Sequence, residues 1–143
     1  MFFRKKIKGN LLKYYIPAQI SGCLLGVMFA NVFFEHSLLE LSTKNRDGLH
    51  IFFSEIVATF GLIFIIFATL KDGKTIVAIS VATYISAGYW FTSSTSFANP
   101  AVSLARTFTD SFTGINYLNT PTYILAEFIG LILAAYILRI VYK

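Results

Sequence analysis

Four long apolar stretches dominate the sequence and restrict what the chain can fold into. They are residues 14–34, 51–70, 75–91 and 123–142, of which the third is the shortest. About 20 apolar residues at ~1.5 Å each are enough to cross the ~30 Å hydrocarbon core of a bilayer. Of the 143 residues, 56% are hydrophobic and only 13% are charged, too few charges to cover a water-soluble domain. The sequence therefore predicts an all-α membrane protein with four transmembrane helices in the lipid bilayer.

The basic residues between these stretches predict how the chain is oriented. Nine of them fall on one side of the expected membrane, whereas the other side has Lys44 and Arg46 beside three acidic residues. Cytoplasmic loops carry an excess of Lys and Arg. Both termini are therefore expected in the cytoplasm, with the protein in the plasma (inner) membrane. The nine are Arg4, Lys5, Lys6, Lys8, Lys13, Lys71, Lys74, Arg139 and Lys143.

Several other classes of protein are not indicated by the sequence. The net charge of +5 does not predict nucleic-acid binding, because the basic residues flank apolar runs and form no patch with interleaved aromatic residues. Cys23 is the single cysteine, and no cluster has metal-ligand spacing. His36 and His50 are interpreted as surface residues without acidic or cysteine partners at ligand spacing. No nucleophile–base pair or phosphate loop suggests an enzyme, and no metal or cofactor is expected.

The first and last apolar stretches resemble each other. "YYIPAQISGCLLG" (14–26) and "TYILAEFIGLILA" (122–134) match at five of thirteen positions, and Gln19 aligns with Glu127. The two stretches would cross the membrane in opposite directions, which is typical of inverted repeats with a solute site near the midplane. Small residues also recur every four positions within both stretches, which predicts close helix–helix contacts. They are Gly22, Gly26 and Ala30 in the first, and Gly130 and Ala134 in the last.

A polar segment separates the third and fourth stretches. Five consecutive hydroxyl residues, Thr92 to Ser96, precede Asn99 and Pro100. Asn is a favoured N-cap and Pro a favoured first helical residue, so a helix is expected to start here. We predict a re-entrant segment over residues 92–112. It enters the membrane as extended chain to Ala98, turns at Asn99, and returns as a half-helix to about Phe108. The alternative is an ordinary external loop with a capped helix.

The residues around this turn resemble a known family. "FANPAVSLAR" (97–106) is similar to the second Asn-Pro-Ala box of the aquaporin and glycerol facilitator family. The stretches at 14–26, 54–70 and 126–137 resemble that family's third, fourth and sixth spans. The resemblance implies that Asn99, Pro100 and Ala101 form the pore box, and that the Asn99 amide donates hydrogen bonds to passing solutes. The family has six spans and two boxes, so this sequence lacks the first two spans and the first half-helix.

The resemblance also implies where selectivity resides. Water-selective members of the family have Arg three residues after the box asparagine, where this chain has Val102. Ala87 falls at the fifth-span filter position and Ser96 at the loop position. These small side chains imply a wide constriction that passes glycerol, urea or uncharged metalloid hydroxides. Arg106 either supplies a charge at the pore mouth or pairs with Asp110, and we favour the pairing.

Two carboxylates lie inside expected spans, where charged groups are costly and are usually functional. By resemblance, Glu55 accepts hydrogen bonds from backbone N–H groups between Thr92 and Ala98 and so supports the re-entrant segment. Glu127 receives no role from the resemblance and is expected to make a buried contact, protonated or paired.

The leading hypothesis is a passive channel subunit for water or small uncharged solutes. It would be a truncated or split chain that is inactive alone, completed by a separate chain with the missing first half and homotetrameric when complete. One alternative is a small four-span proton-coupled exporter that uses a membrane glutamate as carrier. Another is a non-functional gene fragment.

Overall fold

The computed structural model describes residues 9–142, in which the regular secondary structure is all helical, without a strand in this range. The elements are a short 3-10 helix at Gly9–Leu11, α1 (Leu12–Phe33), α2 (Leu49–Thr69) with a 3-10 turn at Leu70–Asp72, α3 (Lys74–Phe91), α4 (Pro100–Ala105) with a 3-10 turn at Arg106–Phe108, and α5 (Thr120–Val141). The predicted all-α fold class is confirmed.

Three helical segments are long and apolar enough to cross a membrane, namely Gly9–Phe33, Leu49–Asp72 and Thr120–Val141. The chain is therefore a multi-pass membrane protein. Helix α3 has 18 residues and is not among these three. Its crossing of the membrane remains a prediction.

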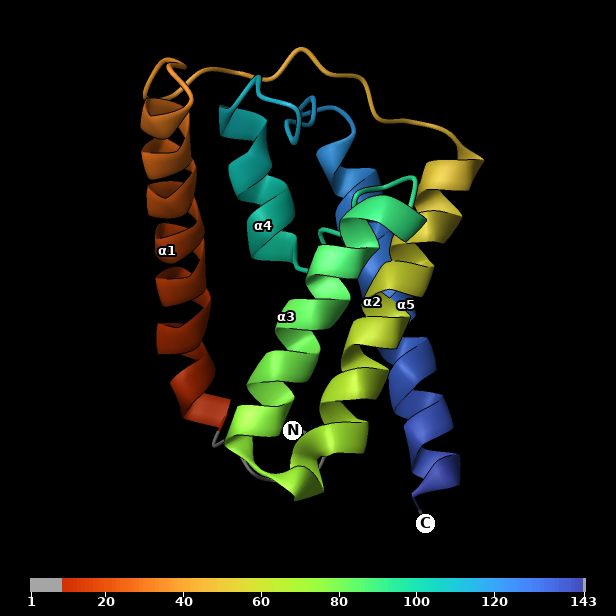
Figure 1. The fold of residues 1–143 in the computed structure, drawn as a ribbon. Helices are drawn as coiled ribbons and strands as arrows, with labels where there is room; N and C mark the ends of the chain where they lie inside the picture. Colours follow the sequence, from red (N-terminus) through yellow and green to blue (C-terminus); the bar gives the residue numbers. More distant parts are fainter. Residues whose placement is uncertain (1–8, 143) are drawn as a thin grey trace.

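The helices run alternately up and down, so that Gly9 and Tyr142 lie at the same end of the molecule (Figure 1). We call this the terminal end and the opposite one the loop end. Helix α4 is the exception: it starts among the other helices, partway along their length, and rises to the loop end (Figure 1). The most extensive helix–helix contact is between α2 and α5, and α3 packs on α2. Helix α1 contacts mainly α4 and its 3-10 extension.

The close contact between α2 and α5 depends on small residues of α5. A Cβ atom at Gly130 would lie 2.6 Å from the Ile56 carbonyl oxygen and 2.9 Å from the Thr59 Cβ. Ala126 and Ala134, on the same face of α5, are fully buried. Small residues let helix backbones approach closely in lipid, where packing drives association. The predicted contact is thus present for the last stretch.

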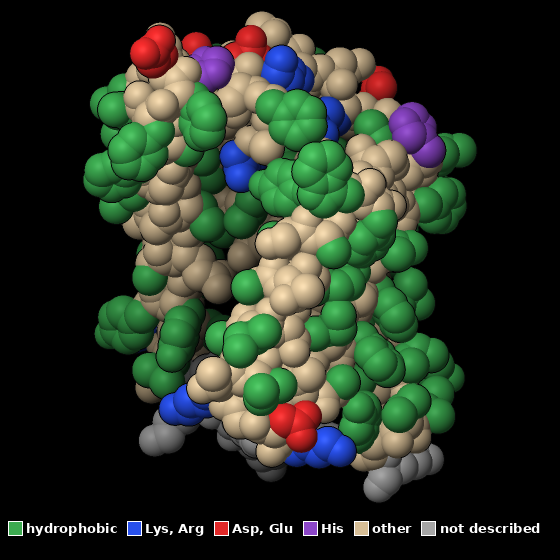
Figure 2. Space-filling view, in the orientation of Figure 1, with side chains coloured by type: hydrophobic (Ala, Val, Ile, Leu, Met, Phe, Trp, Pro, Cys, Tyr) green, Lys and Arg blue, Asp and Glu red, His purple; other side chains and the backbone are tan. Residues whose placement is uncertain are grey.

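The same pattern has the opposite outcome in α1. A Cβ atom at Gly22 or at Gly26 would meet nothing within 4 Å. Within the described chain, the close contact predicted for these two glycines is therefore not made. Figure 2 shows a hollow between α1 and α3, which leaves this side of α1 uncovered.

A strap, residues 34–48, crosses the loop end from α1 to α2 (Figure 1). It pairs with the chain that follows α4: the Ser42 N–H donates to the Thr107 carbonyl (3.0 Å) and the Asn116 N–H to the Lys44 carbonyl (2.8 Å). Asn31, buried near the end of α1, donates its amide to the Phe108 carbonyl (3.2 Å). These bonds add to the helix–helix contacts that hold α1 against α4.

Candidate pore segment

The segment after α3 turns into the helical assembly and does not run over its surface. The Thr92 backbone N–H still donates to the Gly88 carbonyl (3.1 Å), which ends α3. Residues 94–98 are then buried without being helical, and Ser94 is completely enclosed. An ordinary external loop would be exposed, because backbone polar groups usually stay in water when no partner is present.

The conformation of this segment differs from the expected extended strand. Thr95, Ser96 and Ala98 have left-handed backbones, with φ of 64°, 51° and 50°. Such residues cost about 1–3 kcal/mol each and persist only where the surroundings hold them. Here the Tyr123 hydroxyl donates to the Ser94 carbonyl (3.2 Å), and the Ser96 N–H donates to the Ser94 Oγ (3.3 Å). The prediction of an extended chain to Ala98 was therefore wrong, since local pattern alone does not reveal this tertiary support.

Helix α4 begins where the Asn-Pro pair predicts. Asn99 is the N-cap, with extended backbone, and its Oδ1 accepts a hydrogen bond from the Ala101 N–H (2.9 Å). Pro100 is the first helical residue, where its missing N–H costs nothing. Because Oδ1 is engaged with the helix, Nδ2 is the part of the Asn99 side chain left to donate to another group. The helix continues as a 3-10 turn to Phe108.

Two buried glutamates, one in α2 and one in α5, bind the backbone of the turn at Asn99. The Oε1 of Glu55, in α2, accepts a hydrogen bond from the Ala98 N–H. The Oε1 of Glu127, in α5, accepts from the Asn99 N–H (3.1 Å) and from the Ser103 hydroxyl (2.6 Å). We call Glu55 and Glu127 the carboxylate clamp. The sequence offered only one signal for Glu127, a carboxylate inside an apolar span, and its partners could not be inferred from that signal.

Arg46, in the strap, was not singled out by the sequence. Its guanidinium donates to the carbonyls of Gly114 (2.8 Å) and Phe112 (2.6 Å) and to the Thr95 hydroxyl (3.4 Å). It also lies 5.8 Å from the centre of the Phe97 ring. Arg46 therefore joins the strap to both arms of the re-entrant segment. No local pattern marks it, because its partners lie far along the chain.

Arg106 and Asp110 do not pair, contrary to the expectation. Arg106 donates to the hydroxyls of Thr113 and Tyr89 (3.2 Å for Tyr89). Asp110 faces the strap instead and accepts from the Thr43 N–H (2.9 Å). This backbone bond holds the pKa of Asp110 below its usual range. The stability that this contact contributes is therefore fully present at neutral pH and is lost as the pH falls through that lowered pKa.

The three residues expected in the selectivity region have different surroundings. Ser96 is buried beside Gly88, which follows Ala87 in α3. Ala87 is itself exposed. The Val102 side chain is partly buried and packs on an apolar cluster formed by Phe97, Ile115 and Tyr123.

The histidine interpretation also needs correction. The His36 Nδ1 lies 2.8 Å from the Glu40 carboxylate, four residues later, so His36 does have an acidic partner. Glu40 in turn accepts from the Asp110 N–H (3.2 Å). The described part of the chain contains no group of three His, Cys, Asp or Glu side chains that could hold a metal ion.

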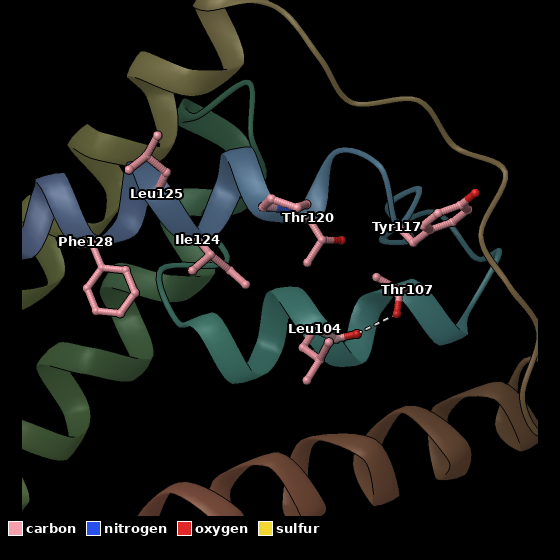
Figure 3. A pocket seen from close by; sticks show the side chains of 8 residues that line it. Leu104, Thr107, Tyr117, Thr120, Ile124, Leu125 and Phe128 are labelled. Carbon is pink, nitrogen blue, oxygen red and sulfur yellow. Dashed lines mark hydrogen bonds between the residues drawn. The ribbon is translucent and has the colours of Figure 1, made fainter.

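An open apolar pocket of about 510 Å³ lies between α4 and α5, beside the turn and not at it (Figure 3). It is lined by Leu104, Thr107, Tyr117, Thr120, Pro121, Ile124, Leu125 and Phe128. The Thr107 hydroxyl donates to the Leu104 carbonyl (2.7 Å) and so is not free to bind a ligand as a donor (Figure 3).

The arrangement defines a class of protein: an α-helical, multi-pass membrane protein in which a buried half-helix starts at a capped Asn-Pro turn. The chain is 42% identical over 125 residues to the aquaglyceroporin AqpS of Rhizobium meliloti (strain 1021). That alignment covers 87% of this chain and 54% of the relative, so the chain spans about half the relative's length. No family model and no solved structure matched. The chain belongs to the aquaporin family.

Proposed function

We propose that this chain forms part of a passive channel for water or small uncharged solutes. The observation that carries the proposal is the turn at Asn99. The side-chain Oδ1 of Asn99 caps α4, its backbone N–H is bound by Glu127, and its Nδ2 is left to donate to a solute. A fixed donor on a buried half-helix suits single-file passage of polar, uncharged molecules. The box of this channel would be Asn99, Pro100 and Ala101.

The solutes of the channel include molecules larger than water. Val102, at the position of the arginine in water-selective members, carries no charge and packs on the apolar cluster. The relative is an aquaglyceroporin by name, which supports glycerol or a solute of similar size. Ala87 and Ser96 complete the proposed selectivity region. Arg106, held by Tyr89 and Thr113, is the candidate charge at the pore mouth.

A working pore needs further helices beside α1. The uncovered Gly22 and Gly26 and the hollow between α1 and α3 support this part of the proposal (Figure 2). These helices would correspond to the first two spans and first half-helix of the family, on a separate chain if this one is translated alone. We further propose that the complete pore is a homotetramer, with both termini of this chain in the cytoplasm.

The exporter hypothesis is disfavoured by the same contacts. A carrier glutamate must exchange protons with both sides of the membrane, so its carboxyl group must be accessible. Glu55 and Glu127 are 0% and 2% exposed, and each binds backbone of the re-entrant segment. Their surroundings fit a structural role.

Stopped-flow measurements on liposomes test the proposed function. With a first-half chain co-expressed and co-purified, we expect glycerol and urea flux well above that of empty liposomes. Val102→Arg should lower glycerol flux by about tenfold or more and spare water, because a guanidinium narrows the constriction and adds fixed donors. Water flux with no passage of glycerol or urea by the unmodified complex would contradict the solute range.

The chain reconstituted by itself is expected to give no flux above empty liposomes. One side of its pore would be hollow, so the path for a polar solute would not be closed off from the lipid. Quantitative light scattering at equal protein density, with the co-expressed complex as the positive control, measures this. Flux from the chain alone that equals that of the complex would overturn the proposed need for further helices.

A further inference from the structure

Three buried oxygen atoms lack hydrogen-bond partners where α2 meets α5. They are the Oε2 of Glu55, the Oγ1 of Thr59 and the Oε2 of Glu127, none of which has a partner within residues 9–142. Their residues are 0%, 4% and 2% exposed. Buried polar atoms in native proteins are nearly always hydrogen-bonded to protein or to ordered water. Three exceptions at one interface therefore point to a ligand.

The packing of the two helices brings these three residues close together along the α2–α5 interface. The contact between Gly130 and Thr59 sets the register of α5 against α2. Both helices run in the same direction (Figure 1). With a rise of ~1.5 Å per residue, Glu55 lies ~6 Å before Thr59, and Glu127 lies ~4.5 Å before Gly130. The two glutamates are thus nearly level, and Thr59 lies about one turn further along.

The hydrogen bonds of the carboxylate clamp also place the two glutamate side chains at the same turn. The Oε1 atoms of Glu55 and Glu127 bind the N–H groups of two consecutive residues, Ala98 and Asn99. Consecutive Cα atoms are only ~3.8 Å apart. The two carboxyl groups therefore lie beside the same turn on neighbouring helices, and each has its second oxygen unpartnered within residues 9–142.

We propose that Glu55, Glu127 and Thr59 form a binding site for one buried water molecule. A water molecule can donate two hydrogen bonds and accept others, so it can partner both Oε2 atoms whether or not one of the carboxyl groups carries a proton. The Thr59 hydroxyl donates to the water oxygen. Three bonds is the typical number for a buried water molecule. The water would join the two arms of the clamp, so that α2, α5 and the turn at Asn99 are held as one unit.

This site goes beyond the proposed channel function, because it requires no solute and no second chain. The alternative occupant is a monovalent cation, because three oxygen atoms can also serve as its ligands. A water molecule leaves the stability of the protein independent of which cation is present. A bound cation raises stability in the presence of the ion that fits.

Thermal unfolding of the 143-residue chain in detergent micelles tests the site. Thr59→Val removes the hydroxyl and keeps the shape of the side chain, and should lower the unfolding midpoint by roughly 3–6 °C. Thr59→Ser keeps the hydroxyl and should retain most of the stability. The matched control is Thr83→Val, the same substitution at an exposed position of α3, which should have no effect. A midpoint for Thr59→Val equal to or above that of the unmodified chain would overturn the site.

Two further measurements separate the occupants. Exchange of potassium or sodium for choline should leave the midpoint unchanged, and a midpoint that depends on the cation would overturn the water in favour of an ion. An experimental structure of the chain at about 2 Å should show density within hydrogen-bond distance of all three oxygen atoms. A structure at that resolution without such density would refute the site even if Thr59→Val fails to fold.

Discussion

Gly130→Val is expected to separate α2 from α5 and to lower the free energy of unfolding by about 3 kcal/mol, the upper end of the cost of overpacking. A Cβ atom alone would lie 2.6 Å from the Ile56 carbonyl oxygen, 2.9 Å from the Thr59 Cβ and 3.1 Å from the Phe60 nitrogen. Two of the three neighbours are backbone atoms, which cannot move without displacing α2. Reversible unfolding of the chain in mixed micelles, followed by circular dichroism, measures the change.

Gly26→Val is the matched control for this substitution. Gly26 lies inside α1, as Gly130 lies inside α5, but a Cβ atom there meets nothing within 4 Å. In the chain alone, the change should alter the free energy of unfolding by less than about 1 kcal/mol, since valine and glycine differ little in helix propensity. Equal losses for the two variants would show that the α2–α5 contact is looser than described.

These two glycines also show what sequence pattern can and cannot predict. Both belong to stripes of small residues at a spacing of four, and the aligned stretches around them look alike. The spacing predicts that a helix face can be approached closely, yet it does not say which neighbour approaches. A Cβ atom at Gly130 meets α2, whereas one at Gly26 meets nothing within 4 Å. Whether a helix face can be approached closely depends on its own residues. Which helix packs against it depends on the rest of the assembly.

The re-entrant segment also has one part that could be predicted from the sequence and one part that could not. The start of α4 could be predicted from Asn99 and Pro100, because capping and the fixed φ of proline act within a few residues. The left-handed Thr95 and Ser96 could not be predicted, since their conformations depend on side chains from the strap and from α5. The bond between His36 and Glu40 was within reach of sequence reasoning, because the two residues lie only four positions apart.

The clamp residues show why the candidate site was only partly foreseen. Glu55 was assigned through family resemblance, and its contact with the Ala98 N–H lies within the range expected. Glu127 has an equivalent contact one residue later, with the Asn99 N–H. Both carboxylates are conspicuous in the sequence as charges within apolar spans. Their convergence on one turn follows only from the packing of α2 against α5.

Glu55→Ala is expected to abolish solute flux through the completed pore, to less than about one tenth of the unmodified rate. The substitution leaves the Ala98 N–H buried without an acceptor, which costs about 1–3 kcal/mol. Ala98 is also left-handed, at φ 50°, and needs its surroundings to remain so. Without the contact to Glu55, the turn before Asn99 relaxes, and the Nδ2 donor of Asn99 loses its position.

Glu55→Gln and Glu35→Ala distinguish this mechanism from a general loss of charge. Glutamine retains one carbonyl oxygen that can accept from the Ala98 N–H, so it should restore a large part of the flux. Glu35 is an exposed carboxylate in the strap, and its removal should change neither flux nor stability. Stopped-flow light scattering measures the flux, and hydrogen exchange at the Ala98 amide measures the hold on the turn directly. Exchange at that amide should accelerate in Glu55→Ala and stay slow in Glu55→Gln; unchanged exchange in Glu55→Ala would mean that Glu55 does not position the turn.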